Sequence, residues 1–316
     1  MRKALCVGIN YYSIGELYGC VNDAKAVANT LKRNYDSTLN FETNVLLAED
    51  EYSAINRVDL KSAIEDLFAG DSEIALFYFS GHGYLETTGG YIVSSDSTTG
   101  DDGVSLRDIL TYASNSRATN KIIILDSCFS GNAGTINQFE EFSLISEGTT
   151  ILTACGRNQY ATEENGHGLF TSLLVDALSG GATNLLGEVT PGSVYAYIDQ
   201  SLGAFQQRPL FKTNIKNFVP LTKCKPPIAL SELHLLTELF KSSDDEFMLD
   251  PTYEFTEDKC IEEHCSKFKI LQHYNRLNLV VPVGEEHMYF AAMNSKSCKL
   301  TPLGRHYWNL VKNNRI

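Results

Sequence analysis

The segment Lys121–Gly131 reads K-I-I-I-L-D-S-C-F-S-G and joins a run of apolar, β-forming residues to a cysteine. A short apolar run that ends in turn residues is typical of a buried strand in a parallel sheet. In open α/β sheets, ligands bind just beyond the carboxyl ends of such strands. Cys128 stands at this end of the predicted strand, so we expect it to be a reactive residue.

A second segment of the same design lies upstream. Ile74–Gly83 reads I-A-L-F-Y-F-S-G-H-G, and His82 stands between two glycines, 46 residues before Cys128. A cysteine and a histidine at the ends of neighbouring strands can act as nucleophile and base. Either residue alone could be part of the core, but the two together predict cysteine-type catalysis.

Strand and helix signals alternate along the first two thirds of the chain. This alternation predicts an α/β fold, a three-layer α/β/α sandwich with a mostly parallel sheet. The expected strands are 4–9, 43–47, 74–80, 91–93, 121–127 and 149–154. The expected helices begin near Asn22-Asp23, Asp59, Val104, Leu169 and Val194, and a polar loop is expected over 131–148.

The segment 223–227, K-C-K-P-P, marks a change of organisation. Its two prolines and the end of the alternation indicate a linker. We therefore predict one domain over residues 1–221, a linker over 222–228 and a second domain over 229–316. The expected elements of this second domain are helices 231–241, 258–265 and 268–277, a hairpin of 279–283 with 288–292, and a helix after Thr301-Pro302. This order predicts a small winged-helix domain.

Composition excludes several classes of protein. The 316 residues include 43% hydrophobic and 21% charged residues, which is ordinary for a globular chain, and the formal net charge of −13 argues against nucleic acid as the main partner. The eight cysteines are scattered, a pattern that indicates reduced thiols in the cytoplasm. No apolar run has the length of a signal peptide or a membrane span, so we expect a soluble protein with no membrane partner.

The segments 78–83, Y-F-S-G-H-G, and 126–131, D-S-C-F-S-G, together give the chain a family resemblance. It resembles the metacaspase type of caspase-like cysteine peptidases. The segments 8–10, 19–24, 153–155 and 168–171 support the same resemblance, which covers residues 1–221. The resemblance implies the caspase-like version of the predicted three-layer fold.

It also implies a mechanism. Cys128 would attack a peptide carbonyl, and His82 would act as base toward the thiol or protonate the leaving amine. The backbone N–H groups of Gly83 and Cys128 would form the oxyanion hole, where a glycine lets the main chain approach the substrate closely.

The resemblance places Asp23, Asp126 and Ser80 in the first specificity pocket. Carboxylates in a partly desolvated pocket favour Arg or Lys before the cut. Apoptotic caspases, by contrast, carry a Gln-Ala-Cys type signature where this chain has Asp-Ser-Cys. Structural roles are the alternatives: Asp23 could cap its helix, Asp126 could hydrogen-bond a loop, and Ser80 could be a framework residue.

Two groups of residues raise the question of metals. Cys260, His264 and Cys265 would need a fourth ligand, His273 or His287, to bind zinc, and helix packing is the favoured interpretation. Many metacaspases require calcium, for which the acidic loop with Asp96, Asp101 and Asp102 is the candidate. This loop lacks an EF-hand pattern, so a solvated loop is favoured. Calcium is the one cofactor kept as a candidate.

The distribution of charged residues along the chain also bears on how the protein is activated. Residues 122–156 contain no Lys or Arg, so an enzyme with a basic preference could not cut itself within 131–148. We therefore expect activation through 229–316, by an unknown ligand or protein. Residues 266–316 carry eight basic and two acidic residues, whereas 229–265 carry two basic and eleven acidic ones. The acidic half favours a protein- or ligand-sensing domain over a DNA-binding one.

The sequence therefore predicts a cysteine endopeptidase specific for Arg or Lys, which the resemblance links to stress or defence responses. The alternatives are a catalytically silent scaffold that signals through its winged helix and a DNA-binding regulator with a degenerate peptidase domain. The presence of both Cys128 and His82 favours the peptidase.

Overall fold

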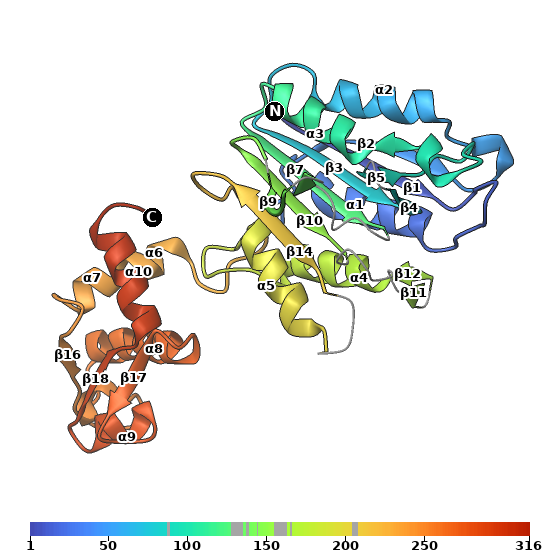
Figure 1. Ribbon diagram of the computed structural model, residues 1–316. Helices are drawn as coiled ribbons and strands as arrows, with labels where there is room; N and C mark the ends of the chain where they lie inside the picture. Colours follow the sequence, from blue (N-terminus) through green and yellow to red (C-terminus); the bar gives the residue numbers. More distant parts are fainter. Residues whose placement is uncertain are drawn as a thin grey trace. The chain divides into compact units, whose positions relative to one another are not determined.

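The computed structural model divides the chain into two compact units, Met1–Pro226 and Pro227–Ile316 (Figure 1). It describes residues 1–86, 89–127, 135–136, 139–143, 145–154, 163–164, 166–203 and 208–316. Cys128 and Cys155 lie outside the described residues. Each unit is described by itself below.

The first unit is built on a six-stranded sheet with the order β14-β10-β7-β3-β1-β2. The strands are β1 (Arg2–Ile9), β2 (Glu42–Ala48), β3 (Ile74–Ser80), β7 (Asn120–Asp126), β10 (Thr149–Thr153) and β14 (Leu210–Asn214). All neighbouring pairs are parallel except β10 with β14. The predicted, mostly parallel sheet is therefore confirmed, with an antiparallel edge strand that the sequence analysis had not anticipated.

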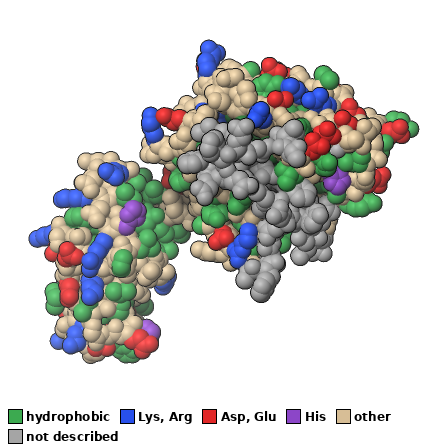
Figure 2. Space-filling model, in the orientation of Figure 1, with side chains coloured by type: hydrophobic (Ala, Val, Ile, Leu, Met, Phe, Trp, Pro, Cys, Tyr) green, Lys and Arg blue, Asp and Glu red, His purple; other side chains and the backbone are tan. Residues whose placement is uncertain are grey.

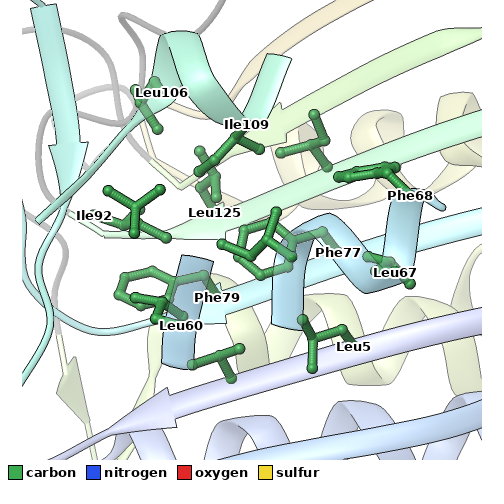
Figure 3. Packing of buried hydrophobic residues seen from close by; sticks show 14 of the residues in the cluster. Leu5, Leu60, Leu67, Phe68, Phe77, Phe79, Ile92, Leu106, Ile109 and Leu125 are labelled. Carbon is green, nitrogen blue, oxygen red and sulfur yellow. The ribbon is translucent and has the colours of Figure 1, made fainter. Parts of the chain in front are cut away.

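Helices cover both faces of this sheet. α2 (Arg57–Phe68) and α3 (Leu106–Asn115) pack on one face, against side chains such as Leu5, Phe77 and Leu125 (Figure 3). α1 (Cys20–Lys32), α4 (Leu169–Asp176) and α5 (Pro191–Ser201) share the core of the other face. Successive strand residues alternate between these two cores because side chains in a strand point to opposite faces. This arrangement confirms the three-layer sandwich.

Several smaller elements of this unit differ from the expectations. β4 (Gly83–Glu86), β5 (Gly89–Ile92) and β6 (Val104–Ser105) form an antiparallel sheet directly after the His82 segment. The expected polar loop contains a hairpin of β8 (Thr135–Ile136) and β9 (Phe139–Ser143). Two further small pairs are β11 (Glu163–Glu164) with β12 (His167–Gly168), and β13 (Glu188–Val189) with β15 (Thr222–Lys223). Short turns of helix are η1 (Glu51–Ser53), η2 (Gly100–Asp102) and η4 (Ala177–Gly181).

The second unit combines a three-stranded antiparallel sheet with helices. Its elements are α6 (Leu230–His234), α7 (Leu236–Leu239), β16 (Glu246–Met248), η5 (Pro251–Tyr253), α8 (Glu262–Arg276), β17 (Val280–Val283), α9 (Met288–Met293), β18 (Ser297–Leu300) and α10 (Pro302–Lys312). The strand order is β16-β18-β17. On the face turned to the viewer in Figure 2, basic and acidic side chains of this unit are interspersed.

Three expectations for this unit were wrong in detail. Residues 288–292 form a helix, because Met288, Ala291 and Ala292 share one buried face at helical spacing. The strand that pairs with β17 is β18 instead. The two helices expected over 258–277 are the single helix α8, and the helix expected over 231–241 is divided into α6 and α7. The closing helix begins as predicted, with Thr301 as its N-cap and Pro302 in its first turn.

Two further features concern membrane spans and disulfides. Within the described part of the chain, no helix is both long and apolar enough to cross a bilayer. No disulfide joins the described cysteines, which are Cys6, Cys20, Cys224, Cys260, Cys265 and Cys298.

Substitution of Gly8 tests the close contact between β1 and the first turn of α1. A Cβ at this position would lie 2.3 Å from the carbonyl oxygen of Cys20 and 2.9 Å from the Cβ of Ala24. We expect Gly8→Ala to destabilise the first unit by about 1–3 kcal/mol because both neighbours belong to a packed helix. Urea unfolding measures this change in the free energy of unfolding.

Gly192→Ala is the matched control. The three atoms nearest to its added Cβ belong to the ring of Phe218, which is 44% exposed and can move aside. In the first turn of α5, alanine should be neutral or stabilising by up to about 1 kcal/mol. Equal effects of the two substitutions would contradict this interpretation of Gly8.

Candidate active site

The ends of β3 and β7 bring the two sequence motifs to one edge of the sheet. Ser80 and Asp126, the last residues of these strands, are direct partners in the parallel register. The amide of Gly81 donates a hydrogen bond to the carbonyl oxygen of Asp126 at 3.3 Å. His82 follows Ser80 by two residues. Cys128 follows Asp126 by two residues in the sequence, but it lies outside the described residues, so its position is not described.

His82 is held by the loop after β1. Its backbone N–H donates to the hydroxyl of Tyr12 at 2.9 Å, and the two rings lie 4.6 Å apart between centroids. Its Nε2 lies 2.9 Å from the carbonyl oxygen of Gly15. A carbonyl oxygen can only accept, so Nε2 carries the proton, and Nδ1 is the basic nitrogen of the neutral ring. Nδ1 is therefore the atom of His82 that can exchange a proton with a reacting group.

Glycine at position 81 allows this arrangement. A Cβ there would lie 2.2 Å from the hydroxyl oxygen of Tyr12 and 2.8 Å from the ring of Phe79. Both rings are buried, at 3% and 0% exposure. Any larger residue at position 81 would displace the tyrosine that holds the backbone of His82.

Asp23 lies in the first turn of α1, where it is 1% exposed. The N-cap of this helix is Gly19, so the alternative role of Asp23 as a capping residue is not supported. Its Oδ2 accepts hydrogen bonds from the hydroxyl of Ser80 at 3.2 Å and from the amide of Gly168 at 3.1 Å. Its Oδ1 lies 2.9 Å from Nδ1 of His167. Burial raises the pKa of Asp23, and the hydrogen bonds from His167, Gly168 and Ser80 act in the opposite direction.

Asp126 reaches the same place from β7. It is 5% exposed, and its Oδ2 accepts a hydrogen bond from the hydroxyl of Thr171 at 2.6 Å. The hydroxyl of Tyr78 lies 2.6 Å from the Thr171 oxygen. Since the Thr171 proton is directed to a carboxylate, Tyr78 is the donor in this pair. Burial, and then the charges of Asp126 and Asp23, raise the pKa of Tyr78, which keeps its hydroxyl protonated.

Gly168 lies close to both carboxylates. A Cβ at this position would lie 2.4 Å from Oδ2 of Asp126 and 3.2 Å from Oδ2 of Asp23. Asp23 and Asp126 both lie close to Gly168, and Ser80 is bonded to Asp23, so these three side chains form one cluster, which we name the acidic hollow. The structure brings together the three residues that the resemblance grouped, although their role in binding substrate stays a prediction.

Other residues of this site were not predicted from the sequence. Tyr12 and Gly15 hold His82, whereas His167, Gly168 and Thr171 complete the acidic hollow. The segment 168–171 had supported the family resemblance, and this was the available signal for Gly168 and Thr171. His167 stands immediately before that segment and had no signal of its own.

Several of the residues considered for metals have other partners. Asp102 accepts hydrogen bonds from Thr98 and Thr99 within its own loop, and Asp96 accepts from Ser94 and the amide of Arg57. His264 contacts Thr252, and His273 pairs with Glu232. Among the residues that the structure describes, no group of three or more His, Cys, Asp or Glu side chains could hold a metal ion.

Comparison with known proteins agrees with the fold and the motifs. The profile of the caspase domain family of peptidases matches residues 1–219, more than two thirds of the chain. This chain belongs to the caspase domain family. The first unit is therefore called the caspase domain below.

Curated relatives include Metacaspase-1 from Meyerozyma guilliermondii, 37% identical over 91 residues, and Metacaspase-1 from Pyricularia oryzae, 39% identical over 88 residues. Each match covers 26% of this chain, and 21% and 22% of the respective relatives. The matched part is thus about a fifth of the length of these relatives.

Solved structures share the fold at low identity. A protein from Geobacter sulfurreducens superposes with a TM-score of 0.53 at 18% identity, covering 71% of this chain and 100% of that one. Caspase-1 from Spodoptera frugiperda gives a TM-score of 0.51 at 12% identity, covering 71% of this chain and 90% of that one. The superposition on caspase-1 confirms the caspase-like fold.

The raised pKa of Asp23 predicts a pH-dependent stability difference between the wild type and Asp23→Asn. A carboxyl whose pKa is higher in the folded state binds its proton more tightly there. It therefore favours folding at acid pH, and this advantage is lost as pH rises through the folded-state pKa. The stability of the wild type relative to Asp23→Asn should fall as pH rises from about 4 to 8, which thermal unfolding across this range measures.

Asp102→Asn is the control with the opposite sign. Hydrogen bonds from Thr98 and Thr99 lower the pKa of Asp102 to about 2. Its contribution is present above the unfolded-state pKa and is lost as pH falls through the folded-state value. Parallel pH profiles for the two variants would contradict the environments described for these carboxylates.

Proposed function

We propose that the caspase domain is a cysteine endopeptidase that cleaves after Arg or Lys. The observation that carries this proposal is the acidic hollow, in which two buried carboxylates from different elements converge on Gly168. It lies at the same sheet edge as the His82 segment, since Ser80 contributes to the hollow and precedes His82 by two residues. A guanidinium or ammonium group is the complement of two carboxylates in a desolvated site.

The proposed reaction uses Cys128 and His82. The Cys128 thiol transfers its proton to Nδ1 of His82, and the sulfur attacks the scissile carbonyl carbon. The tetrahedral intermediate collapses to a thioester as His82 returns the proton to the leaving amine. Water then hydrolyses the thioester and releases the acid product and the Cys128 thiol. The carbonyl oxygen of Gly15 keeps the proton on Nε2, so that Nδ1 serves both steps.

The backbone amides of Gly83 and Cys128 are the proposed oxyanion hole. Gly83 begins β4, whose pairing with Ile92 of β5 fixes the backbone immediately after His82. The carbonyl oxygen of His82 accepts a hydrogen bond from the amide of Val93 at 3.0 Å. These contacts support a rigid main chain at the point where negative charge would develop.

The C-terminal unit is proposed to be a regulatory winged-helix module. Support comes from the strand order β16-β18-β17, with α8 preceding the last two strands. In a plain wing these two strands would be joined by a loop, but here the connection contains α9. The mixed charge of this unit favours a protein or small-molecule ligand over DNA as the activating partner.

The proposal also includes a cellular compartment and a biological role. The absence of disulfides among the described cysteines supports a reducing compartment such as the cytoplasm. A role in a stress or defence response follows from the family resemblance and stays a prediction.

Peptide turnover tests the proposed specificity. The test uses fluorogenic peptides that differ only in the residue before the cut, which is Arg, Lys, citrulline or Asp. Their turnover should distinguish the effect of side-chain charge from the effect of side-chain shape. Loss of one charge-assisted contact costs about 1.5–3 kcal/mol, so citrulline should lower kcat/KM by about 10- to 100-fold relative to Arg. Asp should not be cleaved, because a third carboxylate would be repelled.

Variants then assign the reaction to the proposed residues. Cys128→Ala and His82→Ala should each lower kcat by at least about 100-fold, and Cys260→Ala, an exposed thiol of the other unit, should leave it unchanged. Turnover of the Asp peptide in preference to Arg would refute the specificity. Absence of turnover under all inducers would favour a silent scaffold.

Activation without self-cleavage has a separate test. Residues 122–156 contain no Lys or Arg, so active protein should keep an uncut segment over 131–148. Intact-mass measurement of the full chain during turnover of an Arg peptide should find no fragment that ends in this segment. A cut there that appears in the wild type but not in Cys128→Ala would overturn this part of the proposal.

A further inference from the structure

His167 occupies the acidic hollow from within the chain. Its Nδ1 lies 2.9 Å from Oδ1 of Asp23, although the two residues are 144 positions apart in the sequence. The histidine side chain is 42% exposed, whereas that of Asp23 is 2% exposed. The imidazole therefore extends from the surface to a buried carboxylate, as the basic end of a substrate side chain would have to do.

The two oxygens of Asp23 have different environments. Oδ2 accepts hydrogen bonds from Ser80 and from the backbone of Gly168, which belong to the frame of the hollow. Oδ1 is the oxygen that His167 contacts. A guanidinium or ammonium group that reached Asp23 would find Oδ2 already bonded to the frame. It would therefore compete with the imidazole for Oδ1.

The backbone around His167 is held in place. The carbonyl oxygen of Gly166 accepts a hydrogen bond from the side-chain amide of Asn22 at 3.4 Å, and Gly168 is bonded to Asp23. His167 and Gly168 also pair with Glu164 and Glu163 in the β11–β12 ladder. The imidazole can leave Oδ1 by rotation of its own side chain, because it is half exposed while its backbone stays anchored.

Among the described residues, two carboxylates lie near this histidine. Asp23 on α1 contacts it directly, and Asp126 on β7 lies close to the neighbouring Gly168. The imidazole is charged only when protonated, and in that form it would pair with Asp23 more strongly.

We propose that His167 is a built-in competitor for the basic side chain of the substrate, one that occupies the Asp23 end of the acidic hollow until Arg or Lys displaces it. The proposal rests on the proposed function, since it assigns a specificity-controlling role at the same hollow. It predicts that His167 sets the affinity for basic substrates without taking part in the reaction itself.

A series of substitutions at this position gives the test. In the full chain, His167→Ala should lower KM for an Arg peptide by about 3- to 10-fold with kcat unchanged, as expected for loss of a partly exposed ionic competitor. His167→Lys, a permanent cation on a longer side chain, should raise KM. His167→Gln, which is neutral, should lie between the wild type and His167→Ala.

Two controls separate competition from a structural role. Turnover of the citrulline peptide should change by less than about 2-fold across the series, because that side chain carries no charge. His306→Ala, an exposed histidine of the C-terminal unit, should match the wild type. The proposal is overturned if His167→Ala and His167→Lys shift KM in the same direction, or if Arg and citrulline peptides respond alike.

A measurement of ligand binding tests the same competition without depending on peptide turnover. Agmatine presents a guanidinium group, and calorimetry can measure its affinity for full-length chains that carry Cys128→Ala. Addition of His167→Ala should tighten binding, and addition of His167→Lys should weaken it. If no peptide is cleaved but this order holds, the proposed peptidase function fails and the competition stands. An order that is reversed or flat overturns the competition.

Discussion

Burial of two carboxylates at one sheet edge is the constraint on which the candidate site depends. Asp23 and Asp126 are 1% and 5% exposed, in a region where an isolated charge would be unfavourable. The fold compensates with donors from three different elements. Ser80 comes from β3, Gly168 from β12, Thr171 from α4, and Tyr78 supports Thr171 from β3. Removing the hydroxyl of Ser80 or Thr171 would take away a hydrogen bond that stabilises a buried carboxylate.

The same constraint explains why this part of the fold is closely packed. Gly8 lets the first turn of α1 lie against β1, and that turn carries Asp23. The position of Asp23 near the N-terminus of α1 also places its negative charge where the helix dipole favours it. Gly168 lets the backbone lie close to both carboxylates. Small residues thus determine where the charged ones can lie.

Sequence reasoning predicted the frame of the site well because that frame depends on local patterns. The runs 74–80 and 121–126 are fully buried strands, as their uninterrupted apolar character indicated. Asp23, Asp126 and Ser80 were grouped through family resemblance, and the structure places them together. His167 could not be predicted in this way, because a contact between residues 144 positions apart leaves no periodic signal. In the second unit, M-Y-F-A-A-M at 288–293 was too short for a strand to be distinguished from a helix by spacing.

If the acidic hollow binds a basic side chain, as we propose, its buried acids also pose a stability problem when no substrate is bound. Burial raises the pKa of Asp23, so the ionised form that would bind a cation is the form that the fold disfavours. A basic side chain from the chain itself can offset this cost between substrates, but it then competes with the substrate. A half-exposed histidine is suited to both demands, because its pairing is weaker than that of a permanent cation and it can rotate away without opening the core. Stability of the free enzyme and affinity for basic substrates would then depend on the same carboxylate oxygen, Oδ1 of Asp23.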